Sequence, residues 1–200
     1  MIAILDYGSG NIRSAQRACE RVGLETKVTS DRDIAKSAVG LVVPGVGAFD
    51  SCMQQLKAIG GDEVIQERVA AGRPILGICV GMQILFEGSE EGGESATPGL
   101  AIFPGKIERL TAPILPQMGW NRVQSMTGSN LFRDLDGEAF YFVHSYALVR
   151  RPVVGKFATS DYNGEFISAY ENGPISAVQF HPEKSGAAGL KLLSNWASSI

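Results

Sequence analysis

Apolar residues in the first half of the chain occur in two alternating patterns. Short apolar runs at residues 2–6, 41–43 and 75–78 predict buried strands, and residues 24–29 predict a further strand. Between these runs, apolar residues recur three and four positions apart, which is typical of one face of a helix; they are Ile12, Ala15, Cys19 and Val22, then Phe49, Cys52, Met53 and Leu56. Strands that alternate with helices predict a parallel sheet covered by helices on both faces.

Two further signals complete this half. Residues 64–71 predict another helix, which ends at Gly72, and Asn11 stands where the first helix would take its N-cap. The polar, glycine-rich residues 87–98 predict a loop.

The second half of the chain has a different pattern. Residues 139–148, 153–159, 165–170 and 175–180 are strand-like and are separated by turns, with no helical spacing between them. A last helical stripe is formed by Leu190, Leu193, Trp196 and Ile200. We therefore expect a single α/β domain over residues 1–200, whose sheet is parallel at first and gains antiparallel strands later.

Composition narrows the possible classes of function. The formal net charge of the 200 residues is −3, without a basic cluster, so binding to nucleic acid or to a membrane surface has no electrostatic support. The N-terminus lacks a basic region, and no apolar run approaches the roughly 20 residues that span a bilayer. Three widely spaced cysteines without a CxxC motif argue against a disulfide framework or a zinc site. We expect a cytoplasmic protein without a metal or cofactor.

The segment Gly77 to Gly81 reads Gly-Ile-Cys-Val-Gly and lies between a buried strand and a predicted helical stretch at residues 82–86. This is the glycine–x–nucleophile–x–glycine pattern, in which a sharp strand-to-helix turn exposes the central side chain. At a helix N-terminus, unpaired N–H groups favour the thiolate form of a cysteine. Cys79 is therefore the candidate nucleophile, whereas Cys19 and Cys52 lie on apolar helix stripes and are expected to be core residues.

Only two histidines can act as the base. His181 is followed by Pro182, which favours an extended backbone, so that Glu183 would lie on the same side of the chain as His181. A carboxylate there can hold one imidazole nitrogen and leave the other free to take the thiol proton. His144 has no carboxylate two residues away, and we interpret it as a structural strand histidine.

Together these motifs resemble the class I (triad) glutamine amidotransferases, and within them the branch of glutaminase subunits that serve imidazole glycerol phosphate synthase. The likeness covers nearly all of the chain, and the segments that carry it are residues 7–11, 44–47, 77–83, 118–121, 141–146 and 179–186. The resemblance implies a flavodoxin-like α/β fold with a mixed, mostly parallel sheet. It also implies hydrolysis of glutamine to glutamate and ammonia by a triad of Cys79, His181 and Glu183, through a thioester.

Further site residues follow from this resemblance and from the strand-to-helix turn at Cys79. The N–H of Val80 is expected to stabilise the oxyanion, since it follows the nucleophile. A second donor is expected from the strand exit Gly45, Val46 and Gly47, where glycines allow a peptide plane to reorient. Gln83 lies four residues after Cys79, on the same helix face. The family pattern implies that it binds the substrate glutamine, with the backbone of Ser145 and Tyr146 holding the amino-acid end.

The same resemblance implies a heterodimer with a (β/α)8-barrel cyclase subunit, to which ammonia would pass. Asn11, in the loop that follows Gly8 to Gly10, would lie toward this partner, and so would Trp120 and Lys184. The loop is not a dinucleotide fingerprint, because position 13 is arginine instead of glycine. One departure from relatives is Gln117, where they often carry histidine.

Three alternatives remain open on sequence grounds. The chain could be a glutaminase that serves another synthase, such as one for a vitamin or a nucleotide. It could be a non-catalytic flavodoxin-like binding module in which Cys79 is vestigial. It could also be a cysteine hydrolase with no connection to ammonia transfer.

Overall fold

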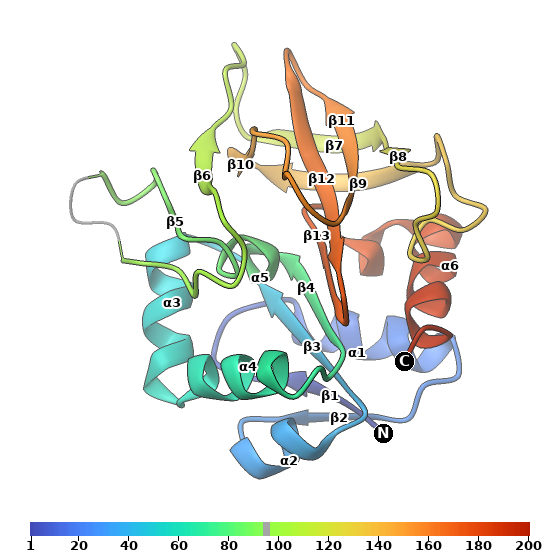
Figure 1. Ribbon diagram of the computed structural model, residues 1–200. Helices are drawn as coiled ribbons and strands as arrows, with labels where there is room; N and C mark the ends of the chain where they lie inside the picture. The colour runs from blue at the N-terminus through green and yellow to red at the C-terminus, as the bar shows by residue number, and fades with distance from the viewer. Residues whose placement is uncertain (94–96) are drawn as a thin grey trace.

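The first half of the chain folds into parallel strands joined by helices, as its apolar pattern predicts (Figure 1). The computed structural model describes residues 1–93 and 97–200. The elements of this half are β1 (Ile2–Leu5), α1 (Ile12–Arg21), β2 (Thr26–Thr29), α2 (Arg32–Ser37), β3 (Gly40–Gly45), α3 (Phe49–Ala58), α4 (Gly61–Ala70), β4 (Ile75–Cys79) and α5 (Val80–Gln83).

The second half is mostly antiparallel. Its elements are β5 (Gly88–Ser89), β6 (Lys106–Arg109), β7 (Gln117–Arg122), β8 (Gln124–Ser125), β9 (Ala139–His144), β10 (Tyr146–Leu148), β11 (Lys156–Asp161), β12 (Glu165–Asn172), β13 (Ile175–Val178), the 3-10 turn η2 (Pro182–Lys184) and α6 (Gly186–Ala197). The sequence therefore separates the two halves of the fold correctly.

Five parallel strands in the order β2-β1-β3-β4-β13 form the centre of the main sheet. This is the order of a flavodoxin-like doubly wound sheet, in which ligands bind beyond the carboxyl ends of the strands. Antiparallel strands β12, β10 and β6 extend the sheet on the β13 side. The expected α/β class, with a mixed and mostly parallel sheet, is confirmed.

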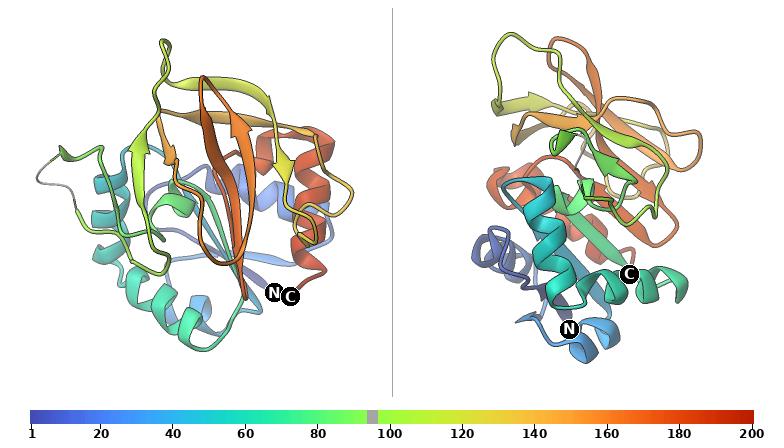
Figure 2. Two further views of the ribbon diagram at one scale, coloured as in Figure 1. Left: turned by 45° about the horizontal axis from the view of Figure 1, so that its top comes forward. Right: turned by 90° about the vertical axis from the view of Figure 1, so that its left-hand side faces the viewer.

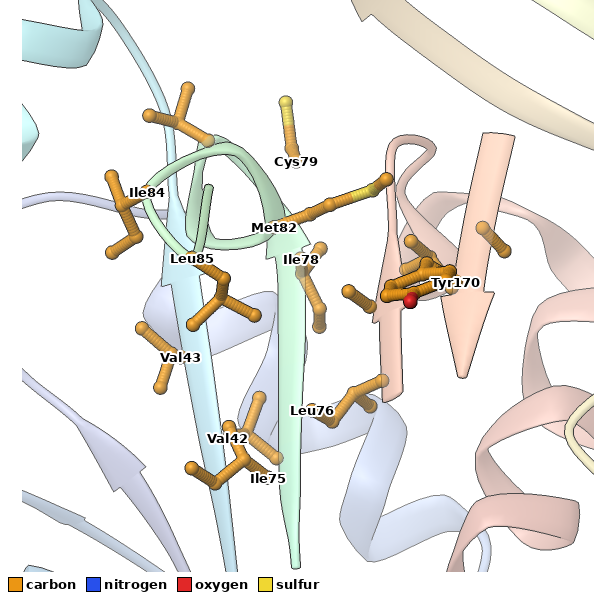
Figure 3. Close-up of a cluster of buried hydrophobic side chains, with 14 of the residues drawn as sticks. Val42, Val43, Ile75, Leu76, Ile78, Cys79, Met82, Ile84, Leu85 and Tyr170 are labelled. Atoms are coloured by element: carbon orange, nitrogen blue, oxygen red, sulfur yellow. The ribbon is translucent and has the colours of Figure 1, made fainter. Parts of the chain in front are cut away.

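Helices cover both faces of the parallel strands. In the right-hand view of Figure 2, α1 and α4 lie on opposite sides of β3 and β4. Helix α1 packs against α6, and α4 packs against α2 and α3. Strands β1, β3 and β4 are buried along their whole length, which explains why their sequences are continuous apolar runs. Figure 3 shows part of this core, where Leu76 and Ile78 of β4 pack near Met82 and Tyr170.

A separate two-stranded sheet, β7 and β9, crosses above the carboxyl ends of the parallel strands (Figure 1). Its inner side rests on an aromatic cluster, in which the ring of Phe180 stacks on Phe140 with 4.2 Å between centroids and meets Phe142 edge-on. The residues of β7 that face outward, Met118 and Trp120, are 65% and 60% exposed. This small sheet forms one wall above the parallel strands.

Several elements differ from the expectation. Helix α2 was not predicted, because Arg32–Ser37 is short and mostly polar. The helical stretch expected over 82–86 is wrong, since α5 is a single turn that ends at Gln83. Strand β5 interrupts the expected loop 87–98, and residues 94–96 of that loop lie outside the described residues. Asn11 does stand at the N-cap of α1, but its side chain makes no capping hydrogen bond. Among the described residues, no helix is long and apolar enough to cross a membrane.

Candidate active site

The turn between β4 and α5 presents Cys79 at the carboxyl edge of the sheet. Cys79 has φ 57° and ψ −114°, a left-handed backbone that side chains rarely adopt. Strain of this kind is typical of a nucleophile elbow, where the surrounding structure fixes the turn. The first N–H groups of α5 can stabilise a thiolate on Cys79. Because α5 has only four residues, the macrodipole of a longer helix does not add to this effect.

The two glycines of the elbow are required by close backbone contacts. A Cβ on Gly77 would lie 2.5 Å from the carbonyl oxygen of Gly81. A Cβ on Gly81 would lie far inside van der Waals contact with the carbonyl oxygen of Val43 on β3. Both obstacles are backbone atoms that cannot move aside. The glycine pattern therefore allows strand β3 and the turn to pack together.

His181 and Glu183 form a buried pair directly after β13. The imidazole Nδ1 lies 2.8 Å from Glu183 Oε1, and both side chains are 3% exposed. The expected extended backbone through Glu183 is wrong, because Pro182–Lys184 forms a 3-10 turn. The turn still brings the carboxylate back to the imidazole. Ser185 fixes this turn, since its hydroxyl donates to the His181 carbonyl oxygen at 2.6 Å and accepts from the Tyr141 N–H at 3.0 Å.

The two histidines have opposite electrostatic environments. Burial lowers the pKa of the His181 imidazole, but its interactions with the Cys79 sulfur and the Glu183 carboxylate outweigh burial and raise the pKa to about 10. Burial lowers the pKa of His144 to about 4, against the smaller effect of its bond to the Tyr146 carbonyl oxygen. The neighbours of His181 therefore favour its protonated form, whereas the burial of His144 favours its neutral form.

A cavity of about 490 Å³ brings most of the predicted site residues together. It is lined by the predicted residues Asn11, Val46, Gly47, Cys79, Val80, Gln83, Ser145, Tyr146, His181 and Lys184. Glu183 is outside this cavity and borders a second one of about 210 Å³ behind His181, as expected for an orienting carboxylate. In the part of the chain that the structure describes, no group of three or more His, Cys, Asp or Glu side chains could hold a metal ion.

The Val46 N–H group, next to Gly45, is not free as the expected second oxyanion donor would be. Gly45 packs against the elbow, where an added Cβ would lie 2.6 Å from the Gly81 nitrogen. The Val46 N–H donates to Ser9 Oγ at 3.2 Å, and the Ser9 hydroxyl donates back to the Val46 carbonyl oxygen at 2.7 Å. The Val46 N–H is thus engaged by Ser9. Gly47, with φ +91°, provides a flexible position directly after it.

Gln83 is buried and hydrogen-bonded, which excludes a solvated helix glutamine. Its Nε2 donates to the Tyr146 carbonyl oxygen at 2.9 Å and to Gln179 Oε1 at 3.0 Å. His144 Nδ1 lies 3.0 Å from the same Tyr146 oxygen. The Gln83 amide hydrogens are taken by these acceptors, so its Oε1 is the group that can accept from a ligand in the cavity.

Three residues near the site were missed or given no role from the sequence. Ser9 belongs to a motif that supported the family resemblance, but it was given no role of its own. Its contact with Val46 forms only when two loops that are distant in the sequence meet. Gln117 is buried opposite His144 in the β7–β9 register. Gln179 lies 3.7 Å from the Cys79 sulfur through its Nε2. Its position two residues before His181 is the one signal that could have indicated a shared face.

The residues expected at a partner interface lie at the rim of the cavity and on the β7–β9 sheet. Trp120 meets the ring of Tyr141 edge-on, with 6.0 Å between centroids. Lys184 Nζ lies 6.0 Å from the centroid of the same Tyr141 ring. Trp120 and Lys184 therefore converge on one half-buried aromatic residue, Tyr141, while Asn11 borders the cavity from the loop after β1.

Known proteins resemble this chain over nearly its whole length. The sequence profile of "Glutamine amidotransferase class-I" matches residues 3–199. The chain is 55% identical over 204 residues to "Imidazole glycerol phosphate synthase subunit HisH" of Mycobacterium tuberculosis, covering 100% of this chain and 98% of that protein. It is 51% identical over 211 residues to the protein of the same name from Thermobifida fusca, with the same coverage.

Solved structures share the fold at lower identity. A "Crystal structure of glutamine amidotransferase" superposes with a TM-score of 0.78 at 18% identity, covering 100% of this chain and 99% of that one. The "Structure of PurLQS from Thermotoga maritima" gives a TM-score of 0.73 at 20% identity, covering 99% and 97%. The chain therefore belongs to the class I glutamine amidotransferases and, within them, to the HisH family of imidazole glycerol phosphate synthase subunits.

Proposed function

We propose that the chain hydrolyses glutamine to glutamate and ammonia through a thioester on Cys79. We further propose that it supplies this ammonia to the cyclase subunit of imidazole glycerol phosphate synthase in histidine biosynthesis. Membership of the HisH family supports the reaction and the partner. The observation that carries the chemistry is the cavity shared by Cys79 and His181, with Glu183 held on the second imidazole nitrogen at 2.8 Å.

In the first half-reaction, the Cys79 thiolate attacks the carbon of the glutamine side-chain amide and forms a C–S bond. The carbonyl electron pair moves onto oxygen and gives a tetrahedral oxyanion. When this intermediate collapses, the C=O bond re-forms and the C–N bond breaks. The His181 imidazolium gives its proton to the leaving nitrogen, which departs as ammonia. Glu183 keeps the imidazole in place and stays ionised throughout.

In the second half-reaction, neutral His181 takes a proton from water as the oxygen attacks the thioester carbon. Collapse of this second oxyanion breaks the C–S bond and returns the electron pair to the Cys79 sulfur. Glutamate leaves, its new carboxyl group gives its proton to solvent, and the thiolate–imidazolium pair is restored. The raised pKa of His181, to about 10, supports a protonated imidazole in the resting site.

Two backbone N–H groups are proposed to stabilise the oxyanion. The Val80 N–H is at the start of α5, where helix geometry leaves it without an intrahelical partner. The second donor is the Val46 N–H, which becomes available when the peptide between Gly45 and Val46 rotates away from Ser9. The Ser9 contact at 3.2 Å supports a resting state in which this donor is withheld. A missing oxyanion donor typically costs about 10²–10³ in rate.

The substrate glutamine is proposed to bind with its amino-acid end against Gln83, Ser145 and Tyr146. The free Gln83 Oε1 suits the substrate ammonium group, since both hydrogens of its Nε2 are already engaged. The backbone of Ser145 and Tyr146 borders the same cavity and offers further polar groups. Residues 1–200 are proposed to act as one glutaminase domain, and a cytoplasmic location remains part of this proposal.

Asn11, Trp120 and Lys184 are proposed to contact the cyclase subunit, with Trp120 as the principal anchor. Support comes from the exposed aromatic surface of Trp120 beside Tyr141, whose ring also lies 6.0 Å from Nζ of the cavity-lining Lys184. Exposed tryptophans with apolar neighbours often dominate the binding energy of an interface. Met118 on the same strand is also exposed and extends this apolar surface.

Glutamate release, measured with and without purified partner subunits, tests this assignment. We expect the cyclase subunit to stimulate release by about tenfold or more, as a coupled partner would, and acceptor subunits of other ammonia-using synthases to have no effect. Trp120→Ala should weaken binding of the cyclase by about 30-fold, because a central aromatic anchor is worth about 2 kcal/mol. Release by Trp120→Ala alone should equal that of the wild type.

Two outcomes would refute parts of the proposal. Stimulation by the acceptor of a different synthase, with none by the cyclase, would show that the partner is wrong. An unchanged affinity of Trp120→Ala for the cyclase would remove Trp120 from the interface while leaving the reaction itself untouched.

A further inference from the structure

Gln179 is a buried glutamine beside the nucleophile that the proposed reaction does not use. It follows β13, whose register pairs Val178 with Ile78, so that Gln179 lies next to Cys79 in the adjoining strand. The side chain is fully buried, and its backbone N–H donates to the Ser168 carbonyl oxygen at 2.9 Å. A buried amide of this kind is retained where its polar atoms have partners.

The hydrogen-bond network fixes the orientation of this amide. The Tyr146 carbonyl oxygen can only accept, so the Gln83 atom at 2.9 Å from it is the donor Nε2. The same Gln83 nitrogen lies 3.0 Å from the Gln179 amide, which must therefore present its Oε1 there. Gln179 Nε2 is then directed at the Cys79 sulfur, 3.7 Å away.

We propose that the Gln179 side-chain amide donates a hydrogen bond to the Cys79 thiolate and links this sulfur to the substrate-binding Gln83. This inference rests on the proposed function, because it assigns Cys79 the role of thiolate. A donor aimed at a charged atom favours the charged form, and the complete burial of Gln179 keeps water from competing for its amide. Gln179 is thus a positioning residue, which holds the sulfur in the cavity and stabilises its reactive form.

Other groups that face the sulfur stay constant when Gln179 is changed. They are His181 beside it, with Glu183 behind this imidazole, Tyr7 and Cys52, which interact with Cys79 electrostatically, and Glu91, His144 and Lys184 around the cavity. A change in the ionisation of Cys79 in a Gln179 variant therefore reports the lost amide donor. In such a variant, Gln83 Nε2 also loses Gln179 Oε1 as its acceptor, and this loss affects substrate binding separately.

The test is the pH dependence of Cys79 alkylation by iodoacetamide, followed by mass spectrometry of the Cys79 peptide. Gln179→Met has nearly the shape of glutamine but no N–H donor. We expect it to raise the midpoint of the alkylation profile by about one pH unit or more, as the loss of a hydrogen bond to a charged atom predicts. Gln179→Glu should raise the midpoint further, because it adds a like charge.

Asn195→Leu is the matched control. Asn195 is another buried amide, which donates to the carbonyl oxygens of Leu131 and Arg133 and does not line the cavity of Cys79. This variant should lower the melting temperature without moving the alkylation midpoint. A midpoint that is unchanged in Gln179→Met, or that moves only in Gln179→Glu, would overturn the proposal and leave Gln179 a core residue. Alkylation needs no glutamine, so this result is independent of whether the chain is a glutaminase.

A measurement on the wild-type chain decides the matter even where the Gln179 variants do not fold. With selective ¹⁵N labelling of glutamine side chains, the Nε2 resonance of Gln179 should shift with pH at the alkylation midpoint of Cys79. In Cys79→Ala this titration should vanish. If no glutamine amide follows the Cys79 midpoint in the wild type, the hydrogen bond to the thiolate does not exist.

Discussion

Replacing Cys79 with alanine is expected to lower glutamate release, measured in the presence of the cyclase subunit, by at least about 10³-fold. Without the sulfur no thioester can form, and His181 alone has no nucleophile to serve. The Val80 and Val46 N–H groups would still polarise the amide, which accounts for any small residual rate. Release of glutamate is measured directly, so that the result does not depend on the acceptor reaction.

The matched control for this prediction is Cys19→Ala. Cys19 is buried on α1, away from the cavity, and burial raises its pKa to about 12, so it is unreactive at neutral pH. Cys19→Ala should keep wild-type turnover, and Cys79→Ala should keep wild-type affinity for the cyclase. A Cys79→Ala protein that retains more than about a tenth of the wild-type rate would remove Cys79 from the mechanism.

Replacing Gly81 with alanine is expected to prevent stable folding, although the change adds one methyl group. Its Cβ would collide with the carbonyl oxygen of Val43, which belongs to the central strand β3 and cannot withdraw without breaking the sheet. We expect a loss of about 4 kcal/mol or more in the free energy of unfolding, at the extreme of single substitutions. Urea unfolding followed by circular dichroism measures it.

Gly88→Ala provides the comparison. Gly88 has no left-handed backbone, and the nearest atom to an added Cβ is 4.0 Å away, so this variant should stay within about 1 kcal/mol of the wild type. Equal stabilities for Gly81→Ala and the wild type would mean that the elbow does not pack against β3 as described.

The parts of the fold that were predicted correctly are those in which one residue pattern dominates. Strands β1, β3 and β4 are buried on both faces, so their sequences are apolar throughout and clearly indicate buried strands. Helix α3 was found from four apolar residues at helical spacing, all of which are buried. Strands β6 and β8 were missed because they are short and mostly polar, and because they pair with strands that are distant in the sequence.

The candidate site was predicted to a similar extent and for similar reasons. Cys79 and His181 are marked by local motifs, and the structure brings both to one cavity. The contact between Glu183 and His181 was expected from an extended backbone, but it forms across a 3-10 turn. The hydrogen bonds of Ser185, which fix this turn, could not be read from the local sequence. The engagement of the Val46 N–H by Ser9 could not be predicted, since it joins loops that are 37 residues apart in the sequence.

The proposed mechanism depends most directly on the contact between the Cys79 sulfur and the His181 imidazole, with Glu183 behind it. Titration of the two ¹⁵N-labelled imidazoles by NMR tests this contact, since the chain has only two histidines. We predict one pKa near 4, for His144, and one near 10, for His181, with the higher value falling by more than one pH unit in Cys79→Ala and in Glu183→Gln. A His181 that titrates near 6.5, and that does not respond to either substitution, would contradict the account.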